Sequence, residues 1–428
     1  MDTTETGRSG VPRWSGAAAS LTQSGGGPAR LLRQVLVSQY FVLYLTIAYF
    51  AVAAVFLPDL VTARNISNQL SNVWPLFAVA IGQTLVIIIM GIDLSQGAIM
   101  GFVSVAGAVV MATAADPNLL GSSPLWGTLL TESGGFLSGS AWSVAVGVAA
   151  MLATGCLIGA LNGFFIARFN MAAFTVTLVS LMLFGAAGIW LTQSQNVVNL
   201  PPGFLRLGSG DLISFYFGEK VEATIKRRDI LSFITYPMVI ALALGLVAEI
   251  TLRKTILGRH IYAVGMNRAA AAISGVPIKR VVVLVFAFSG FCAAVAAILY
   301  SARLGGGRPT IGSGTALLDI IGATVIGGTS LSGGKGKVVW TLIGVVFFVL
   351  LGNTLNYMGL SAFYIDVVKG GIILLAAALD VTRTRLSASE AGGRRTRPLA
   401  FRATPRPSRA TTRRGTAPSR SVADASSA

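Results

Sequence analysis

Few residues in this chain could do catalytic or metal chemistry. The sequence holds one histidine, His260, and two cysteines, Cys156 and Cys292, each inside an apolar run. With a single imidazole in a polar loop, neither a histidine-based triad nor a histidine-rich metal site is expected. The cysteines offer neither a disulfide framework nor metal-ligand spacing. We therefore predict no catalytic residues, no metal site and no cofactor.

Asp93 is the carboxylate nearest the middle of a long apolar region. An ionisable side chain there is costly unless it is paired or faces water, so Asp93 can mark a translocation path. Alternatively, Asp93 or Ser95 caps the helix that follows by accepting hydrogen bonds from its free N–H groups. Asp319 is a second candidate for the path. Asp366 and Lys369 stand three apart on one helix face and are expected to neutralise each other.

Small and polar residues recur in two further apolar runs. Gly155, Gly159 and Gly163 repeat every four residues, which places them on one helix face and predicts close helix packing. Three polar side chains at membrane depth serve either as hydrogen-bond partners between helices or as lining of a translocation path: Asn162, Thr175 and Thr177.

The glycine-rich segment 327–337 resembles a phosphate-binding loop but fails its spacing. A Walker A loop needs glycine five residues before Gly-Lys and then Ser or Thr, whereas Thr329 precedes Gly334 by five and Gly336 follows Lys335. We therefore expect ATP to bind another chain.

The polar loop 251–280 contains a short predicted helix. Asn267 suits a helix N-cap, the following Arg-Ala-Ala-Ala-Ala-Ile forms helix readily, Gly275 suits the left-handed position after a helix, and Pro277 prevents continuation. Its small alanine face could enter a groove on another protein.

Membrane-spanning helices must position these residues. Of 428 residues, 54% are hydrophobic and 11% are charged, too few charges for a soluble surface. Runs of about 18 or more apolar residues can cross a hydrocarbon core of ~30 Å as helix. We predict an all-α, polytopic bundle of about ten transmembrane helices, near 36–58, 73–91, 97–115, 141–167, 172–192, 231–250, 281–303, 315–331, 338–355 and 365–381.

The chain divides into three predicted parts. Residues 1–35 are polar and are expected to form a disordered cytoplasmic segment without a cleaved signal peptide. Residues 36–381 form the transmembrane domain. Residues 382–428, with eleven arginines against Glu390 and Asp424, are expected to form a disordered cytoplasmic tail. This tail accounts for much of the +17 net charge. We expect its arginines to interact with membrane lipid, and we expect no nucleic-acid partner.

Lys and Arg near helix ends predict the orientation. With ten spans and both termini in the cytoplasm, the basic loop 251–280 lies inside, and the loop 116–140, which has no basic residue, lies outside. The loop 193–230 falls outside although it holds five basic residues. Its length and four acidic residues weaken that disagreement.

Four stretches carry a family pattern: GIDLSQG at 91–97, GALNGFFIAR and TVTL at 159–168 and 175–178, TILGRHIYAVGMNRAAAAISG at 255–275, and DIIGATVIGGTSLSGGKG at 319–336. They resemble permease subunits of bacterial ABC importers for simple sugars, the ribose, xylose and galactose group, related more distantly to branched-chain amino-acid permeases. The resemblance spans the chain from about 36 to 381, with departures at Met90 and Gln96 and in the charged insertion 211–230.

The resemblance implies a multi-pass permease of the bacterial cytoplasmic membrane. Such a subunit is not an enzyme; it forms a homodimer, receives sugar from an extracytoplasmic sugar-binding protein, and is driven by a cytoplasmic ABC ATPase, often of two fused ATPase halves. The short helix would be the coupling helix in the ATPase cleft, with the expected residues Gly265, Asn267, Ala270, Ala271 and Gly275.

An ion-coupled secondary transporter or channel for a small polar solute is the alternative function. Secondary transport usually uses a relay of intramembrane ionisable residues. Apart from Asp366 with Lys369, this chain offers chiefly Asp93 and Asp319, so ATP-driven sugar import is the expected function.

Overall fold

A computed structural model of the chain describes residues 40–216 and 230–395. In these residues, each of the ten predicted apolar segments overlaps one helix, which confirms the all-α prediction, although the segment predicted at 231–250 begins with a strand and becomes helical only at Tyr236. Seven helical segments are long and apolar enough to cross a membrane: α3 (Ala63–Ile88), α6 (Ser143–Phe169), α7 (Ala173–Thr192), α9 (Tyr236–Lys254), α12 (Ile278–Leu304), α14 (Val338–Tyr357) and Ala362–Asp380. Three apolar helices are shorter: α2 (Phe41–Phe56), α4 (Gln96–Met111) and α13 (Ala316–Ile326).

Short elements connect these helices. They are the 3₁₀ turn η2 (Pro58–Val61), α5 (Pro117–Leu120), α8 (Pro202–Ser209), α10 (Ile256–Met266) and α11 (Arg268–Ile273). Two antiparallel hairpins pair β1 (Leu130–Thr131) with β2 (Gly134–Gly135), and β3 (Asp211–Tyr216) with β4 (Ile230–Thr235).

Several predicted segments lie partly or wholly outside the described residues. The segment 1–35 and the tail residues 396–428 lie outside them, as does 217–229 of the charged insertion. The last helix, α15 (Ala362–Arg395), continues beyond residue 382, where we expected the tail to begin. A boundary between two compact units follows Arg383, and the bundle described below belongs to the first unit.

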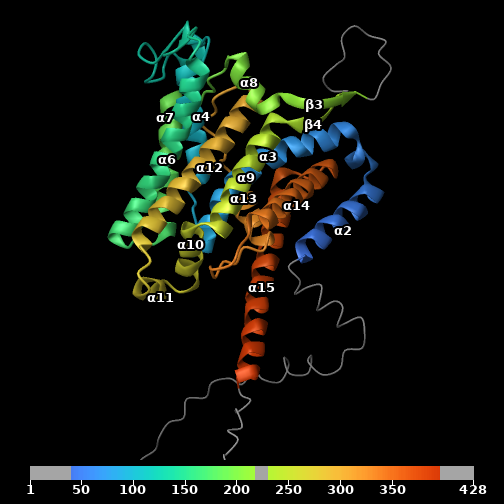
Figure 1. Cartoon of the computed structure of the whole chain (residues 1–428). Coiled ribbons are helices and arrows are strands. Elements are labelled where there is room, and N and C mark those ends of the chain that lie inside the picture. The colour runs from blue at the N-terminus through green and yellow to red at the C-terminus, as the bar shows by residue number, and fades with distance from the viewer. Residues whose placement is uncertain (1–39, 217–229, 396–428) are drawn as a thin grey trace, which may run out of the picture. The chain divides into compact units, whose positions relative to one another are not determined.

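The core of the bundle is formed by α3 and α12. The apolar windows of these two helices are 89% and 72% buried, whereas those of α6 and α7 are only 28% and 22% buried. Figure 1 shows α12 beside α6 and α3, with α8 and the β3–β4 hairpin at one end of the helices and α10 and α11 at the other. The helices at the margin therefore leave much of their apolar surface exposed.

The glycine repeat of α6 packs against α12, as its four-residue spacing predicts. A Cβ added at Gly155 would lie 2.6 Å from the carbonyl oxygen of Gly290, and one at Gly163 would lie 2.7 Å from the Cα of Val283. Both distances are shorter than real Cβ contacts. The glycines therefore allow the two backbones to approach closely.

The connection between α3 and α4 interrupts the apolar region, as predicted. The first helix ends at Ile88, the second begins at Gln96, and Met90 adopts a φ of +64° between them. That left-handed conformation favours glycine, so methionine is an unusual residue for this turn. The break leaves Asp93 in a non-helical segment that is nevertheless buried.

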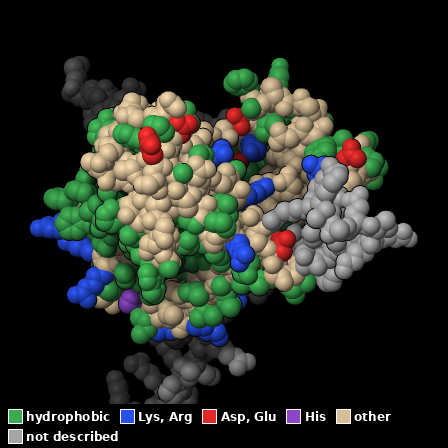
Figure 2. Space-filling model, turned by 90° about the horizontal axis from the view of Figure 1, so that it is seen from above, with side chains coloured by type: hydrophobic (Ala, Val, Ile, Leu, Met, Phe, Trp, Pro, Cys, Tyr) green, Lys and Arg blue, Asp and Glu red, His purple; other side chains and the backbone are tan. Residues whose placement is uncertain are grey.

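The helices at the margin of the bundle expose large hydrophobic side chains. Figure 2, seen from the end that carries α8, shows a face of mainly uncharged polar and backbone atoms with hydrophobic side chains gathered at its margin. Large exposed side chains of this kind occur on α6, α7 and α9, among them Leu157, Leu183 and Leu246, which are 61%, 59% and 62% exposed. Such an apolar surface suits a bilayer.

Candidate functional site

A buried polar cluster surrounds Asp93. Its Oδ1 accepts hydrogen bonds from the backbone N–H and the hydroxyl of Ser95, at 3.0 and 2.5 Å. Its Oδ2 accepts one from the Ser289 hydroxyl of α12 at 2.7 Å. Gln96 donates to the Ser289 oxygen at 2.8 Å, and Asn162 of α6 donates to the Ser95 oxygen at 2.9 Å. The cluster therefore joins the broken segment to α4, α6 and α12.

The donors and acceptors in this cluster match an ionised carboxylate. Each of the two serine hydroxyls gives its single proton to Asp93 and accepts from an amide, so neither is left without a donor or an acceptor. All five side chains are buried, with Asn162 the most exposed at 4%. A buried carboxylate without a paired cation depends on such donors.

The predicted capping of α4 by the side chain of Asp93 or Ser95 is wrong. Ser95 is the N-cap of α4, but its side chain makes no capping hydrogen bond. Asp93 instead accepts from the N–H of Ser95 itself, ahead of the helix. Asp93 thus stabilises the turn before α4, while the Ser95 hydroxyl bonds to Asp93 and Asn162.

The two threonines of α7 have different surroundings. Thr177 is fully buried, and its hydroxyl lies 2.9 Å from the carbonyl oxygen of Ala173 in its own helix and 3.2 Å from that of Ile92, which precedes Asp93 in the chain. Thr175 is exposed and lies away from this contact. Only Thr177 therefore belongs with the cluster.

Asp319 forms an ion pair that the sequence did not predict. Lys369 of α15 lies 2.8 and 2.9 Å from the two carboxylate oxygens of Asp319 in α13. The predicted pairing of Lys369 with Asp366 is therefore wrong. Side chains three apart share a helix face only approximately, and Lys369 is 9% exposed and directed to the neighbouring helix.

The predicted capped helix in the polar loop is present as α11. The Asn267 side chain accepts from the N–H of Ala270 at 3.0 Å, and Gly275 has a φ of +78° after the helix. Ala270 and Ile273 are exposed, the latter by 90%, whereas Ala271 is only 4% exposed. Of the two alanines expected to meet an ATPase, only Ala270 is on the surface.

Gly265 is also buried, and its role is close packing. A Cβ on Gly265 would overlap the carbonyl oxygen of Ile88 and lie 2.7 Å from the amide nitrogen of Gly334. Gly334 donates to the same Ile88 oxygen at 2.9 Å. The glycine therefore lets α10 reach the end of α3 and the glycine-rich segment 327–337, which connects α13 to α14.

Tyr262 and Glu249 strengthen this contact. The Tyr262 hydroxyl donates to the carbonyl oxygen of Gly336 at 2.7 Å, and burial, then the charge of Glu249, raises the pKa of Tyr262, so the hydroxyl keeps its proton. Glu249 accepts from the N–H of Val338 at 2.9 Å and pairs with Arg253. The basic loop, α9 and the start of α14 are thereby joined.

Ser289 is the residue of the cluster that sequence reasoning missed, because a lone serine in an apolar run has no distinctive spacing. Gln96 was noticed only as a departure from the family pattern. In the described ranges, no group of three His, Cys, Asp or Glu side chains could hold a metal ion.

Comparison with known proteins identifies the family. The family model described as the branched-chain amino acid transport system / permease component matches residues 65–377. The ribose import permease protein RbsC of Escherichia coli strain K12 is 33% identical over 331 residues, 77% of this chain and 89% of that protein. RbsC of Bacillus subtilis strain 168 is 33% identical over 325 residues, 76% of this chain and 86% of that protein.

A more distant relative is the xylose transport system permease protein XylH of Haemophilus influenzae strain ATCC 51907, 29% identical over 366 residues, 76% of this chain and 90% of that protein. No solved structure matches the chain. The matched residues run from α3 to α15, and among the described apolar helices α2 lies before them. The chain therefore belongs to the family of permease components typified by the branched-chain amino acid transport system.

Proposed function

We propose that this chain is the membrane-spanning permease subunit of an ATP-driven importer of a simple sugar, with ribose and xylose as the first candidates. The supporting observation is the likeness to ribose and xylose permeases over most of their length. Galactose belongs to the same group of expected substrates.

The proposed driving partner is a separate cytoplasmic ABC ATPase, often of two fused halves. The exposed side of α11, with Ala270 and Ile273, supports this docking because it is small, apolar and uncovered. The cap from Asn267 fixes where the helix starts. An extracytoplasmic sugar-binding protein and a second permease subunit complete the proposed importer.

Movement of α11 has a contiguous route into the bundle. Gly265, in the last turn of α10, lies three residues before α11 and touches Ile88 at the end of α3. The segment that follows Ile88 carries Asp93 and its contacts with α6 and α12. A chain of contacts does not by itself couple two sites. For transport, ATP binding and sugar binding must each shift the equilibrium between two conformations of this contact route.

The test is sugar uptake by proteoliposomes that contain the permease, its ATPase and its binding protein. We expect uptake of labelled ribose or xylose to require internal ATP, to require the binding protein, and to be insensitive to a protonophore. Uptake without ATP that a protonophore abolishes would contradict the proposal and support the ion-coupled alternative. A control with the hydrolysis-deficient ATPase should show only background uptake.

A further inference from the structure

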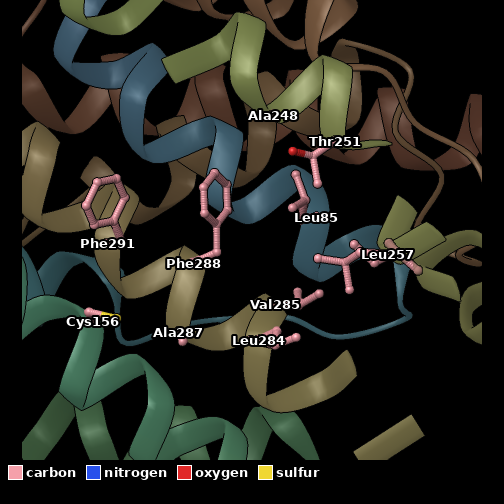
Figure 3. Close-up of a pocket in the computed structure, with 11 residues that line it drawn as sticks. Leu85, Cys156, Ala248, Thr251, Leu257, Leu284, Val285, Ala287, Phe288 and Phe291 are labelled. Carbon is pink, nitrogen blue, oxygen red and sulfur yellow. The ribbon is translucent and has the colours of Figure 1, made fainter. Parts of the chain in front are cut away.

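Two apolar grooves lie along the outer side of α12 and meet at Leu284, which lines both. The first has a volume of about 440 Å³. Figure 3 shows Phe288 and Phe291 of α12 standing in it near Cys156 of α6, with Leu257 across from them. The second, of about 420 Å³, lies between the last turns of α6 and the first turns of α12.

The second groove ends in three cations. Arg168, Lys279 and Arg280 line it together with Phe164 and Val283. All three cations are exposed, and within the described ranges none of them forms an ion pair. The Arg168 guanidinium lies 6.0 Å from the centre of the neighbouring Phe169 ring.

The position of two of these cations is unfavourable without a ligand. Lys279 and Arg280 lie in the first turn of α12, whose N-cap Pro277 provides no side-chain hydrogen bond and whose first turn holds no acidic residue. The positive end of a helix disfavours cations and attracts anions. The groove thus presents a positive end that complements a negatively charged group.

The dimensions and surroundings favour a lipid over a soluble anion. From Arg280 to Phe291 an α-helix rises about 16 Å, close to half of a ~30 Å hydrocarbon core. The flanking faces are apolar, with Leu161 of α6 and Val247 of α9 exposed by 43% and 57%. A soluble anion would use the cations and leave the apolar grooves unfilled.

A second copy of the chain is a less suitable occupant. A two-fold interface through this surface would bring each trio of cations toward the same trio of the partner. Like charges brought together in a membrane-side interface are repulsive. Charge complementarity therefore points to a bilayer component.

We propose that these grooves bind an anionic phospholipid of the cytoplasmic leaflet. Its phosphate contacts Arg168, Lys279 and Arg280. One acyl chain passes Leu284 and continues toward Phe288 and Phe291.

The test is lipid binding to the purified full-length permease, measured by native mass spectrometry with dioleoylphosphatidylglycerol and dioleoylphosphatidylcholine. We expect the first phosphatidylglycerol to bind at least tenfold more tightly than phosphatidylcholine. The triple variant Arg168→Gln/Lys279→Gln/Arg280→Gln should lose this preference. A matched control, Lys254→Gln/Arg259→Gln, removes exposed cations of the same loop outside the grooves and should keep it.

A second variant separates the acyl chain from the headgroup. Ala287→Trp fills the first groove without changing its charge, and we expect it to weaken phosphatidylglycerol binding as well. Glycerol phosphate at millimolar concentration should not compete. Unchanged phosphatidylglycerol affinity in either variant, with unchanged melting temperature, would overturn the proposal. So would loss of ATPase binding in the triple variant with lipid binding intact, which would assign these cations to the ATPase.

Discussion

At Asp93, a buried carboxylate is held by neutral donors. Both serine hydroxyls direct their protons to it, and the amides of Gln96 and Asn162 donate to those hydroxyls in turn. Replacing any one of these side chains would therefore remove a donor or an acceptor from its neighbours. Ser95 links Asp93 to Asn162, and Ser289 links Asp93 to Gln96.

Ser289→Ala should therefore destabilise the permease. The change removes the donor to Asp93 Oδ2 and the closer of two acceptors of the Gln96 amide, which keeps the Val79 carbonyl oxygen at 3.4 Å. A buried group left without a partner costs about 1–3 kcal/mol. We expect a clearly lower melting temperature in detergent. Ser71→Ala is the control, because among the described residues the half-buried Ser71 hydroxyl donates to the Ser67 carbonyl oxygen of its own helix and joins no cluster. Equal melting temperatures for the two variants would show that the cluster is not a stabilising unit.

The ion pair of Asp319 and Lys369 makes a second prediction at this scale. Lys369→Met leaves Asp319 without its cation, and breaking a buried pair costs about 3–5 kcal/mol. We expect a smaller loss here, because 23% of the Asp319 side chain is exposed.

The double variant Asp319→Leu/Lys369→Met should recover most of the stability, because it leaves no unpaired charge. Thermal unfolding of the single and double variants checks this. Additive losses would contradict the pairing.

At the scale of elements, the sequence predicted the helices well and their facing side chains less well. Long apolar runs determine where helices occur, and the caps Asn267 and Gly275 define the short helix by local geometry alone. The partner of Lys369 depends on how α13 and α15 pack, which spacing along one helix does not contain. The burial of Ala271 likewise depends on how α11 lies against the bundle.

Ala270 and Ala271 offer a test of α11 as a coupling helix. Ala270 is the third residue after the Asn267 cap, a position where glutamate suits a helix start. Ala270→Glu should therefore leave melting temperature and membrane level unchanged while abolishing ATPase co-purification and uptake.

Ala271→Glu should lower the melting temperature as well, because the glutamate would be buried. Ala270→Ser is the mild control and should keep most uptake. Normal ATPase binding by Ala270→Glu would refute the proposed docking.

At the scale of the whole molecule, the described bundle has two chemically different ends. One end carries α8, the β3–β4 hairpin and the segment 112–142, and the other carries α10 and α11 with their basic loop. The basic end also holds Arg168, Lys279 and Arg280. An excess of Lys and Arg in short loops marks the cytoplasmic side, so the end with α11 is expected to face the ATPase.

Thiol accessibility tests this orientation directly. In a Cys156→Ala background, Cys292 is fully buried and should stay unreactive. Phe136→Cys and Met266→Cys place one thiol at each end, at positions 68% and 75% exposed. A membrane-impermeant maleimide should label Phe136→Cys in intact cells and label Met266→Cys only after permeabilisation. The reverse pattern would place α11 outside the cell, where it could not meet a cytoplasmic ATPase, and ATP-driven import through that helix would be excluded.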